Sequence, residues 1–158
     1  MSDSPYRIRL AESDDDDFIL GLVHRFIHFP LPNGRTKTDC LKGIEADLVK
    51  HLDEQPSNSY IFIAENDDGE AVGFVHLQKT KDFFTHRDNC HISDIAVAEK
   101  HEGNGVGAAL LDHAYAWAKE HRCQFVTLAV FPGNEKAREL YAKHGFDTDL
   151  VRMARPVR

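Results

Sequence analysis

Three glycines at alternate positions form a short segment whose backbone could bind a phosphate group. The segment is Gly103-Asn104-Gly105-Val106-Gly107. Glycine allows positive φ angles and lets the backbone pass close to a bulky anion. If a helix begins here, its first N–H groups are unpaired and carry a partial positive charge, which suits a phosphate or diphosphate. A tight turn alone needs only one such glycine, so three of them favour an anion cradle.

Two known nucleotide-binding motifs fit this segment less well. A P-loop needs Gly-Lys-Ser/Thr at its end, whereas Ala108 follows Gly107. Gly103, Gly105 and Ala108 match the dinucleotide pattern G-x-G-x-x-G/A. That motif also needs an acidic ribose ligand about 20 residues on, and residues 123–130 contain none. A nucleotide-binding domain that uses the turn differently stays open as an alternative.

Further side chains of chemical interest lie downstream and on two predicted strands. Asn134 and Tyr141 are seven residues apart, about two turns, so both would share one face of a helix. Asn134 could cap that helix, and Tyr141 is either a core aromatic or a catalytic group. Candidates for a general base are Asp94 and His91 on one strand and His76 on its neighbour. Asp94 acting through a water is the first choice, and deprotonation through water alone stays open.

The apolar pattern along the chain predicts one α/β (α+β) domain over residues 1–158. Alternating apolar residues predict strands, and apolar residues three and four apart predict helices. Expected strands are 6–10, 60–65, 71–77, 91–97, 125–131 and 146–153; expected helices are 14–26, 38–52, 108–121 and 134–143. Ser13 is expected to cap the first helix. Strands cluster early and alternate with helices late, which indicates a mixed sheet flanked by helices.

Composition and charge narrow the classes of function. The 158 residues, 42% hydrophobic and 28% charged, fit one globular domain. The formal charge of −7 argues against nucleic acid or an anionic membrane as the main partner. Cys40, Cys90 and Cys123 form no CxxC pair and no zinc pattern, so we expect no metal site. With no long apolar run and no signal-peptide core, we expect reduced thiols and a cytoplasmic location.

The segment from residue 91 to 146 resembles the GNAT superfamily of N-acetyltransferases. That family's acetyl-CoA motif, Gln/Arg-x-x-Gly-x-Gly/Ala, falls on residues 102–107, and the preceding strand ends Asp94-Ile95-Ala96-Val97. The family's second block, N-x-x-A-x-x-L-Y-x-x-x-G-F, is matched at Asn134, Ala137, Leu140, Tyr141, Gly145 and Phe146. Residues 6–77 resemble the family more weakly.

The resemblance implies a fold and a co-substrate. It implies a GNAT-like mixed, mostly antiparallel sheet of six to seven strands with about four helices, splayed between strands 4 and 5 to hold acetyl-CoA. Asn134 would contact the pantetheine arm, and Tyr141 would contact the coenzyme and protonate its sulfur. The remaining coenzyme contacts would be the pantetheine-pairing Ile95, Ala96 and Val97, and the diphosphate-binding Glu102, Gly103, Asn104, Gly105, Val106 and Gly107.

Two residues depart from the family pattern. Glu102 stands where the family usually has Arg or Gln, and a carboxylate beside a diphosphate is repulsive, so we expect weaker coenzyme binding. Ala129 stands where some members carry a glutamate base.

The resemblance therefore predicts an acetyl-CoA-dependent N-acetyltransferase. It would act on a primary amine of a small molecule or peptide by direct attack in a ternary complex. The alternative is a catalytically weak acyl-CoA-binding or sensing protein of the same fold. Dimers are common in the family, so a homodimer is a further expectation, although the sequence assigns no surface to it.

Overall fold

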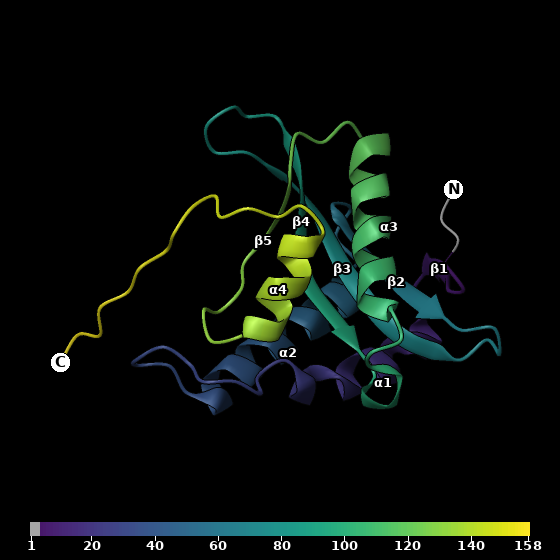
Figure 1. Cartoon of the computed structure of the whole chain (residues 1–158), viewed down its shortest axis with the longest axis horizontal. Helices are drawn as coiled ribbons and strands as arrows, with labels where there is room; N and C mark the ends of the chain where they lie inside the picture. Colours follow the sequence, from purple (N-terminus) through teal and green to yellow (C-terminus); the bar gives the residue numbers. More distant parts are fainter. Residues whose placement is uncertain (1–3) are drawn as a thin grey trace.

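A five-stranded sheet forms the centre of the molecule (Figure 1). The computed structural model describes residues 4–158. In spatial order the strands are β1 (Arg7–Leu10), β2 (Ser59–Glu65), β3 (Ala71–Lys81), β4 (Asp88–Val97) and β5 (Val126–Leu128). Neighbours are antiparallel except β4 and β5, which are parallel. The mixed, mostly antiparallel prediction is confirmed.

The expected count of six to seven strands was too high. Residues 146–153 were predicted as a last strand, but they form no regular structure in the described chain. A strand exists only where its backbone groups find partners on a neighbouring strand. Because no neighbour lies beside 146–153, this segment stays unpaired.

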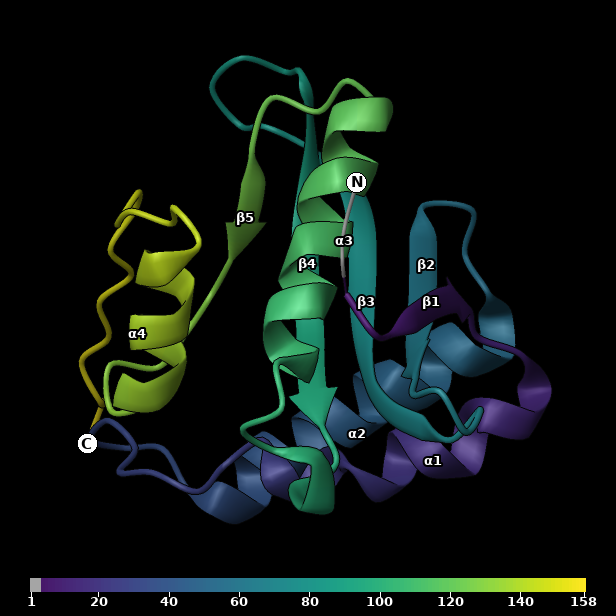
Figure 2. The same cartoon turned by 45° about the vertical axis from the view of Figure 1, so that its right-hand side comes forward.

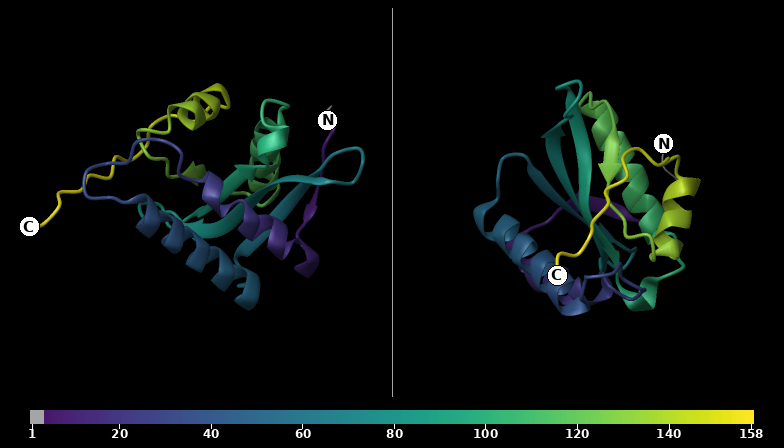
Figure 3. Two further views of the ribbon diagram at one scale, coloured as in Figure 1. Left: turned by 90° about the horizontal axis from the view of Figure 1, so that it is seen from below. Right: turned by 90° about the vertical axis from the view of Figure 1, so that its left-hand side faces the viewer.

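Helices cover both faces of the sheet (Figure 3). On one face lie α1 (Asp16–Gly21) and α2 (Lys37–Glu54), and on the other α3 (Val106–Glu120) and α4 (Glu135–Lys143). Single 3-10 turns add η1 (Ser13–Asp15), η2 (Val23–Arg25) and η3 (Glu99–His101). The prediction of about four helices flanking the sheet is confirmed. Within the described residues, no helix combines the length and apolar character needed to cross a membrane.

The first helical segment begins differently from the expectation. Ser13 was predicted to be the N-cap, but Glu12 occupies that position before η1. The Asp15 carboxylate accepts a hydrogen bond from the Glu12 backbone N–H at 2.7 Å. Arg9 also donates to Asp15, at 2.7 and 3.0 Å, so this aspartate joins β1 to the first turn. Asp15 thus forms the N3 side of a capping box with Glu12, which places the N-cap one residue before Ser13.

Side-chain alternation along the strands builds two apolar cores, one on each face. In β2, Phe62 and Ala64 pack toward α3, whereas Ile63 packs toward α1 and α2. In β3, Val75 packs toward α3, whereas Phe74 packs toward α1 and α2. Successive strand side chains point to opposite faces, so the central strands are apolar on both sides.

The sheet opens between β4 and β5, as the resemblance implied (Figure 2). Only Cys90–Ile92 of β4 pair with Val126–Leu128 of β5. On the other side of β4, the register with β3 shifts: His76 faces Asp94 but Leu77 faces Ile92, which leaves Ser93 as an extra residue. Such a bulge bends a strand and increases its twist. Beyond it β4 diverges from β5, and the edge of Asp94–Ala96 has no strand partner on that side, while the Val97 carbonyl accepts a hydrogen bond from Arg25.

Gly73 of β3 lies close to both β4 and the first turns of α3. A Cβ on Gly73 would lie 2.9 Å from the Ala96 carbonyl oxygen and 3.0 Å from Val106 Cγ1. We expect Gly73→Ala to lower the free energy of unfolding by about 1–3 kcal/mol, because overpacking displaces α3 from β4. Urea denaturation measures the change.

Gly43 provides the matched control. It lies within α2, and a Cβ there would meet nothing within 4 Å. Gly43→Ala should stabilise the protein by up to about 1 kcal/mol, because alanine favours the helix. Equal effects of the two substitutions would contradict the packing described for Gly73.

Candidate functional site

A cleft of about 750 Å³ opens where β4 and β5 diverge. Its walls are the end of β4, the glycine segment with the start of α3, the chain after β5, α4, and the aromatic residues after η2. The predicted site residues that line it are Asp94, Ile95, Ala96, Val97, Glu102, Gly103, Gly105, Val106, Gly107, Asn134 and Tyr141. Asn104 does not line it, and its backbone carbonyl accepts a 2.8 Å hydrogen bond from the Tyr6 hydroxyl.

The glycine segment presents the N-terminus of α3 to this cleft. Gly103 and Gly105 have φ angles of +79° and +83°, a region that other residues adopt only with strain. Gly105 is the N-cap of α3 and supplies no side-chain cap, so the first-turn N–H groups are not covered by one. An anion in the cleft would meet these N–H groups and the positive end of the helix dipole.

The third glycine has a different role from the one expected. Gly107 is not among the residues with positive φ. A Cβ on it would lie 3.3 Å from Leu140 Cδ2 of α4. Gly107 therefore lets α4 approach the start of α3, which keeps the two helices on opposite walls of one narrow cleft.

Two cations neutralise the unusual carboxylate at position 102. Arg25 Nη2 lies 2.9 Å from Glu102 Oε1, and Lys136 Nζ lies 3.4 Å from the same oxygen. Burial opposes ionisation of Glu102, but Arg25 and Lys136 outweigh it and hold the pKa of Glu102 below its usual value. Arg25 Nε also donates to the Val97 carbonyl at 2.8 Å. The carboxylate expected to repel a diphosphate thus anchors two positive groups beside the cradle.

The α4 wall carries the two residues of the second motif. The Asn134 side chain accepts a hydrogen bond from the Ala137 N–H at 3.3 Å, which confirms the predicted N-cap. Tyr141 lies two turns further on the same helix and packs edge-on against Phe146, with ring centroids 5.8 Å apart. Burial raises the pKa of the Tyr141 phenol above its usual value, so it keeps its proton at neutral pH.

Only one of the three base candidates, Asp94, lines the cleft. His91 is not among the lining residues; it bonds Thr127 Oγ1 at 2.8 Å, and burial lowers its pKa. His76 is fully buried, with its Nδ1 2.9 Å from Asp94 Oδ2. Asp94 can therefore meet a substrate, whereas His76 can act on it only through Asp94.

A chain of hydrogen bonds runs from Asp94 into the interior of the protein. His76 Nε2 lies 2.7 Å from Ser59 Oγ, and His51 Nδ1 lies 2.9 Å from the same hydroxyl. Gln78 Nε2 lies 3.2 Å from His51 Nε2. One direction of donation satisfies every bond: Gln78 to His51, His51 to Ser59, Ser59 to His76, and His76 to Asp94. The chain therefore ends on the Asp94 side chain as the acceptor, and the Asp47 carboxylate lies 3.5 Å from His51 Nε2 at its other end.

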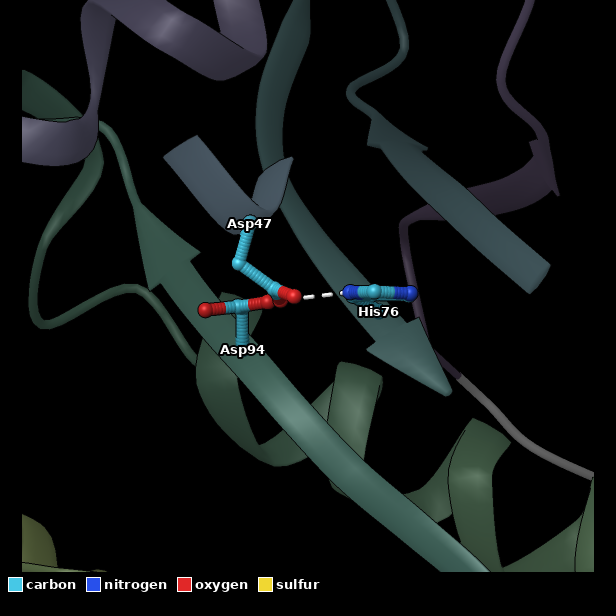
Figure 4. A group of neighbouring side chains, drawn as sticks. All are labelled: Asp47, His76 and Asp94. Atoms are coloured by element: carbon cyan, nitrogen blue, oxygen red, sulfur yellow. Dashed lines mark hydrogen bonds and ion pairs between the residues drawn. The ribbon is translucent and has the colours of Figure 1, made fainter. Parts of the chain in front are cut away.

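Asp47 of α2 brings a second carboxylate to this group (Figure 4). One ligand atom each of Asp47, His76 and Asp94 lie within 4.8 Å of one another, a donor set that a metal ion could use. However, both ring nitrogens of His76 are engaged, one by Asp94 and the other by Ser59. His76 and Asp94 therefore form a hydrogen-bonded pair with the Asp47 carboxylate close beside it, an acidic group that would favour a cationic partner.

Sequence reasoning missed Arg25, Ser59 and His51. Each of them contacts a cleft residue or its support across a long stretch of chain, so no local motif announces them. The first helix was predicted from the four aspartates at 14–17 and from its apolar pattern. Neither feature indicates a role for Arg25.

Comparison with known proteins identifies the family. Residues 31–146 match the model of the acetyltransferase (GNAT) family. The chain belongs to the GNAT acetyltransferase family. It is therefore an acyltransferase, and the predicted resemblance is confirmed.

Individual relatives agree with this assignment. An uncharacterized N-acetyltransferase of Bacillus subtilis, YhfO, is 31% identical over 142 residues, 90% of each chain. A streptothricin acetyltransferase of Streptomyces lavendulae is 30% identical over 118 residues, 75% of this chain and 54% of that protein.

Solved structures show the same fold. A putative acetyl transferase from Pyrococcus furiosus superposes with a TM-score of 0.73 at 24% identity, covering 96% of this GNAT chain and 99% of that one. AAC(6')-Iy, solved in complex with the bisubstrate analog CoA-S-monomethyl-acetylneamine, superposes with a TM-score of 0.70 at 21% identity, covering 98% of this chain and 100% of that one.

Proposed function

We propose that this GNAT protein transfers an acetyl group from acetyl-CoA to a primary amine of a small molecule or peptide, within a ternary complex. One observation carries the proposal: the glycine segment at the start of α3, Asp94 and Tyr141 all line the same cleft. An anion cradle, a proton acceptor and a proton donor are the three parts that acyl transfer from a coenzyme A thioester to an amine requires.

The coenzyme would lie along the diverging edge of β4. The N–H groups from Gly103 to Gly107 would bind the diphosphate, with Arg25 and Lys136 adding positive charge nearby. The free edge at Ile95 and Ala96 offers backbone groups to the pantetheine arm in the manner of an added strand. This placement would leave the thioester between β4 and α4.

The amine must lose a proton before it attacks. Its ammonium would meet Asp94 and, beside it, the second carboxylate of Asp47. Asp94 takes one proton, and the nitrogen lone pair then forms a bond to the thioester carbon. His76, Ser59 and His51 are positioning residues, since their hydrogen bonds hold Asp94 in a fixed orientation. Asp94 returns its proton to solvent after the products leave.

Collapse of the tetrahedral intermediate breaks the carbon–sulfur bond. The Tyr141 hydroxyl would protonate the sulfur as the carbon–sulfur bond breaks, because burial keeps the phenol protonated at neutral pH and therefore available as the donor. The nitrogen loses its second proton as the amide forms, and that proton passes through water to restore the tyrosine. The products are the N-acetylated amine and coenzyme A, and one proton is released overall.

The acceptor is proposed as a class, a cationic primary amine. Relatives named for an acceptor include streptothricin acetyltransferases and a mycothiol acetyltransferase, which differ in chemistry. The paired carboxylates of Asp47 and Asp94 favour a positively charged amine in either case. Phe26, Phe29 and Phe131 line the same cleft and would contact the apolar part of the acceptor.

Coenzyme binding and turnover test the proposal directly. We expect coenzyme A to bind and to raise the melting temperature, with NAD and ATP giving no comparable shift. Release of free thiol from acetyl-CoA should depend on an added amine from a panel of polyamines, aminoglycosides, amino acids and peptides. Binding without amine-dependent thiol release would instead support the acyl-CoA-binding alternative, and preference for NAD or ATP would support a nucleotide-binding domain.

Removing the phenolic hydroxyl tests Tyr141. We expect Tyr141→Phe to lower kcat by about 10²-fold or more, the usual range for a lost proton donor. The Kd for coenzyme A should be unchanged, because the ring and its contact with Phe146 remain. Steady-state kinetics and calorimetric titration measure the two quantities. Unchanged kcat would remove Tyr141 from the mechanism.

Replacing the carboxylate tests Asp94 as the base. We expect Asp94→Asn to lower kcat by about 10²–10⁴-fold with little change in coenzyme A affinity. His91→Gln is the matched control on the same strand, and it should retain activity because His91 does not line the cleft. Ser59→Ala should lower kcat less than Asp94→Asn does and alter its pH profile. Loss of activity in His91→Gln with full activity in Asp94→Asn would reverse the assignment.

A further inference from the structure

One part of the cleft is lined by apolar side chains that are mostly aromatic. Its walls, here called the aromatic pocket, are Phe26 and Phe29 from the segment after η2, Ile44 of α2 and Phe131 from the segment after β5. Phe29 and Phe131 come from distant parts of the chain, yet their ring centroids are 6.0 Å apart. Phe26 packs edge-on against Phe74 of the buried core, at 6.3 Å. The pocket is therefore formed before any acceptor binds.

Asp94 lies on the same face of the sheet as this pocket. Phe26, Ile44 and Ala96 pack against one buried cluster, which lies between the sheet and the helices α1 and α2. Ala96 and Asp94 are two residues apart on β4, so their side chains point to the same face. Asp94 also lines the cleft, although it is only 8% exposed. An amine whose ammonium group meets Asp94 would therefore place the rest of its body in the aromatic pocket.

The four side chains that define the aromatic pocket carry no hydrogen-bonding group. Ser93 lines the cleft beside Asp94, but its hydroxyl already donates to Gln78 Oε1 at 2.7 Å. A hydroxyl or amino group buried among phenyl rings loses water and gains no partner. An aromatic ring or a branched alkyl group instead gains free energy by leaving water. The pocket thus favours an acceptor with an apolar body over one rich in hydroxyl groups.

Charge in the cleft favours an acceptor with a single cation. Asp47 does not line the cleft, and its Oδ1 lies 3.5 Å from His51 Nε2, so Asp94 is the carboxylate available beside the pocket. The other charged side chains that line the cleft are Arg25, Lys136, Lys143, Glu102 and Glu139. Cations outnumber carboxylates among these five. This excess suits the anionic coenzyme and disfavours a second ammonium group on the acceptor.

The segments that carry Phe29 and Phe131 are in direct contact with each other. A Cβ on Gly133 would collide with the Pro30 carbonyl oxygen and would lie 3.6 Å from Phe29 Cδ1. A residue larger than glycine would therefore push the two segments apart. Because they touch, an extended peptide bound at Asp94 could not pass between them, and the pocket suits a small acceptor.

We propose that the acceptor is a small monoamine with an aromatic or branched apolar body. Its ammonium group binds Asp94, and its apolar body lies against Phe26, Phe29 and Phe131, which determine specificity. This inference rests on the proposed function and narrows its acceptor class. The acyl transfer is the one given above, in which the nitrogen–carbon bond forms and the carbon–sulfur bond breaks, so no further reactant is required.

A panel of amines tests the proposal through thiol release from acetyl-CoA. The panel contains phenethylamine, ethylamine as its match without the ring, putrescine, kanamycin and trialanine. We expect kcat/KM for phenethylamine to exceed each of the others by about 10-fold or more, as the fit of an apolar group to its pocket allows. A preference for putrescine, kanamycin or trialanine, or equal values for phenethylamine and ethylamine, would overturn this inference and leave the proposed function intact. Thiol release with none of the amines would overturn both.

Two variants assign the preference to the aromatic pocket. Phe29→Ser and Phe131→Ser should each reduce the ratio of kcat/KM between phenethylamine and ethylamine by about 10-fold, mainly through KM for phenethylamine. Both should keep the rise in melting temperature with coenzyme A, which shows that the fold and the coenzyme site are intact. Phe84→Ser is the matched control, because Phe84 is 68% exposed on the β3–β4 loop and does not line the cleft. An unchanged ratio in both pocket variants, or an equal fall in the control, would contradict the assignment.

Discussion

Parallel pairing between β4 and β5 ends after three residues, and the cleft depends on that early end. Parallel strands normally continue side by side until a turn or helix intervenes. Here the extra residue Ser93 bends β4 just beyond the last paired residue, Ile92. The backbone of Asp94–Val97 consequently faces the cleft instead of a neighbouring strand. The bulge also turns Asp94 to a position opposite His76, so one irregularity sets both the coenzyme edge and the candidate base.

The hydrogen bonds that orient Asp94, the candidate base, come from His76 of β3 and from elements on the far side of that strand. A fully buried imidazole is costly unless both of its nitrogens are bonded. His76 meets this requirement through Asp94 and Ser59, and Ser59 in turn bonds His51 of α2. The orientation of one carboxylate thus depends on three elements of secondary structure. Such a network is rigid because loss of any member leaves a buried polar atom unpaired.

Local patterns in the sequence predicted most of the elements and most of the site. The glycine segment, the Asn134 cap, Tyr141 and Asp94 follow from motifs spanning a few residues, and the cleft brings all of them together. The prediction of a strand at 146–153 was wrong, because strand-like composition does not provide a neighbouring strand for the backbone to pair with.

Contacts between segments that are distant in the sequence could not be predicted from local sequence patterns. Glu102 was expected to repel a diphosphate, but Arg25 and Lys136 reverse its local effect. Nothing near position 102 indicates a cation from residue 25. The same limit applies to Ser59 and His51, which are polar residues without a motif and become significant only through the fold.

Arg25 and Phe26 are consecutive residues that serve opposite ends of the cleft. Arg25 bonds the carbonyl of Val97 and the carboxylate of Glu102 at the anion cradle, while Phe26 lines the cleft beside the expected acceptor. A rigid 3-10 turn, η2, carries one and borders the other. Because Phe26 is the C-cap of η2, the two side chains share one short backbone segment, and any shift of that turn would move the cation at the cradle and the aromatic wall together.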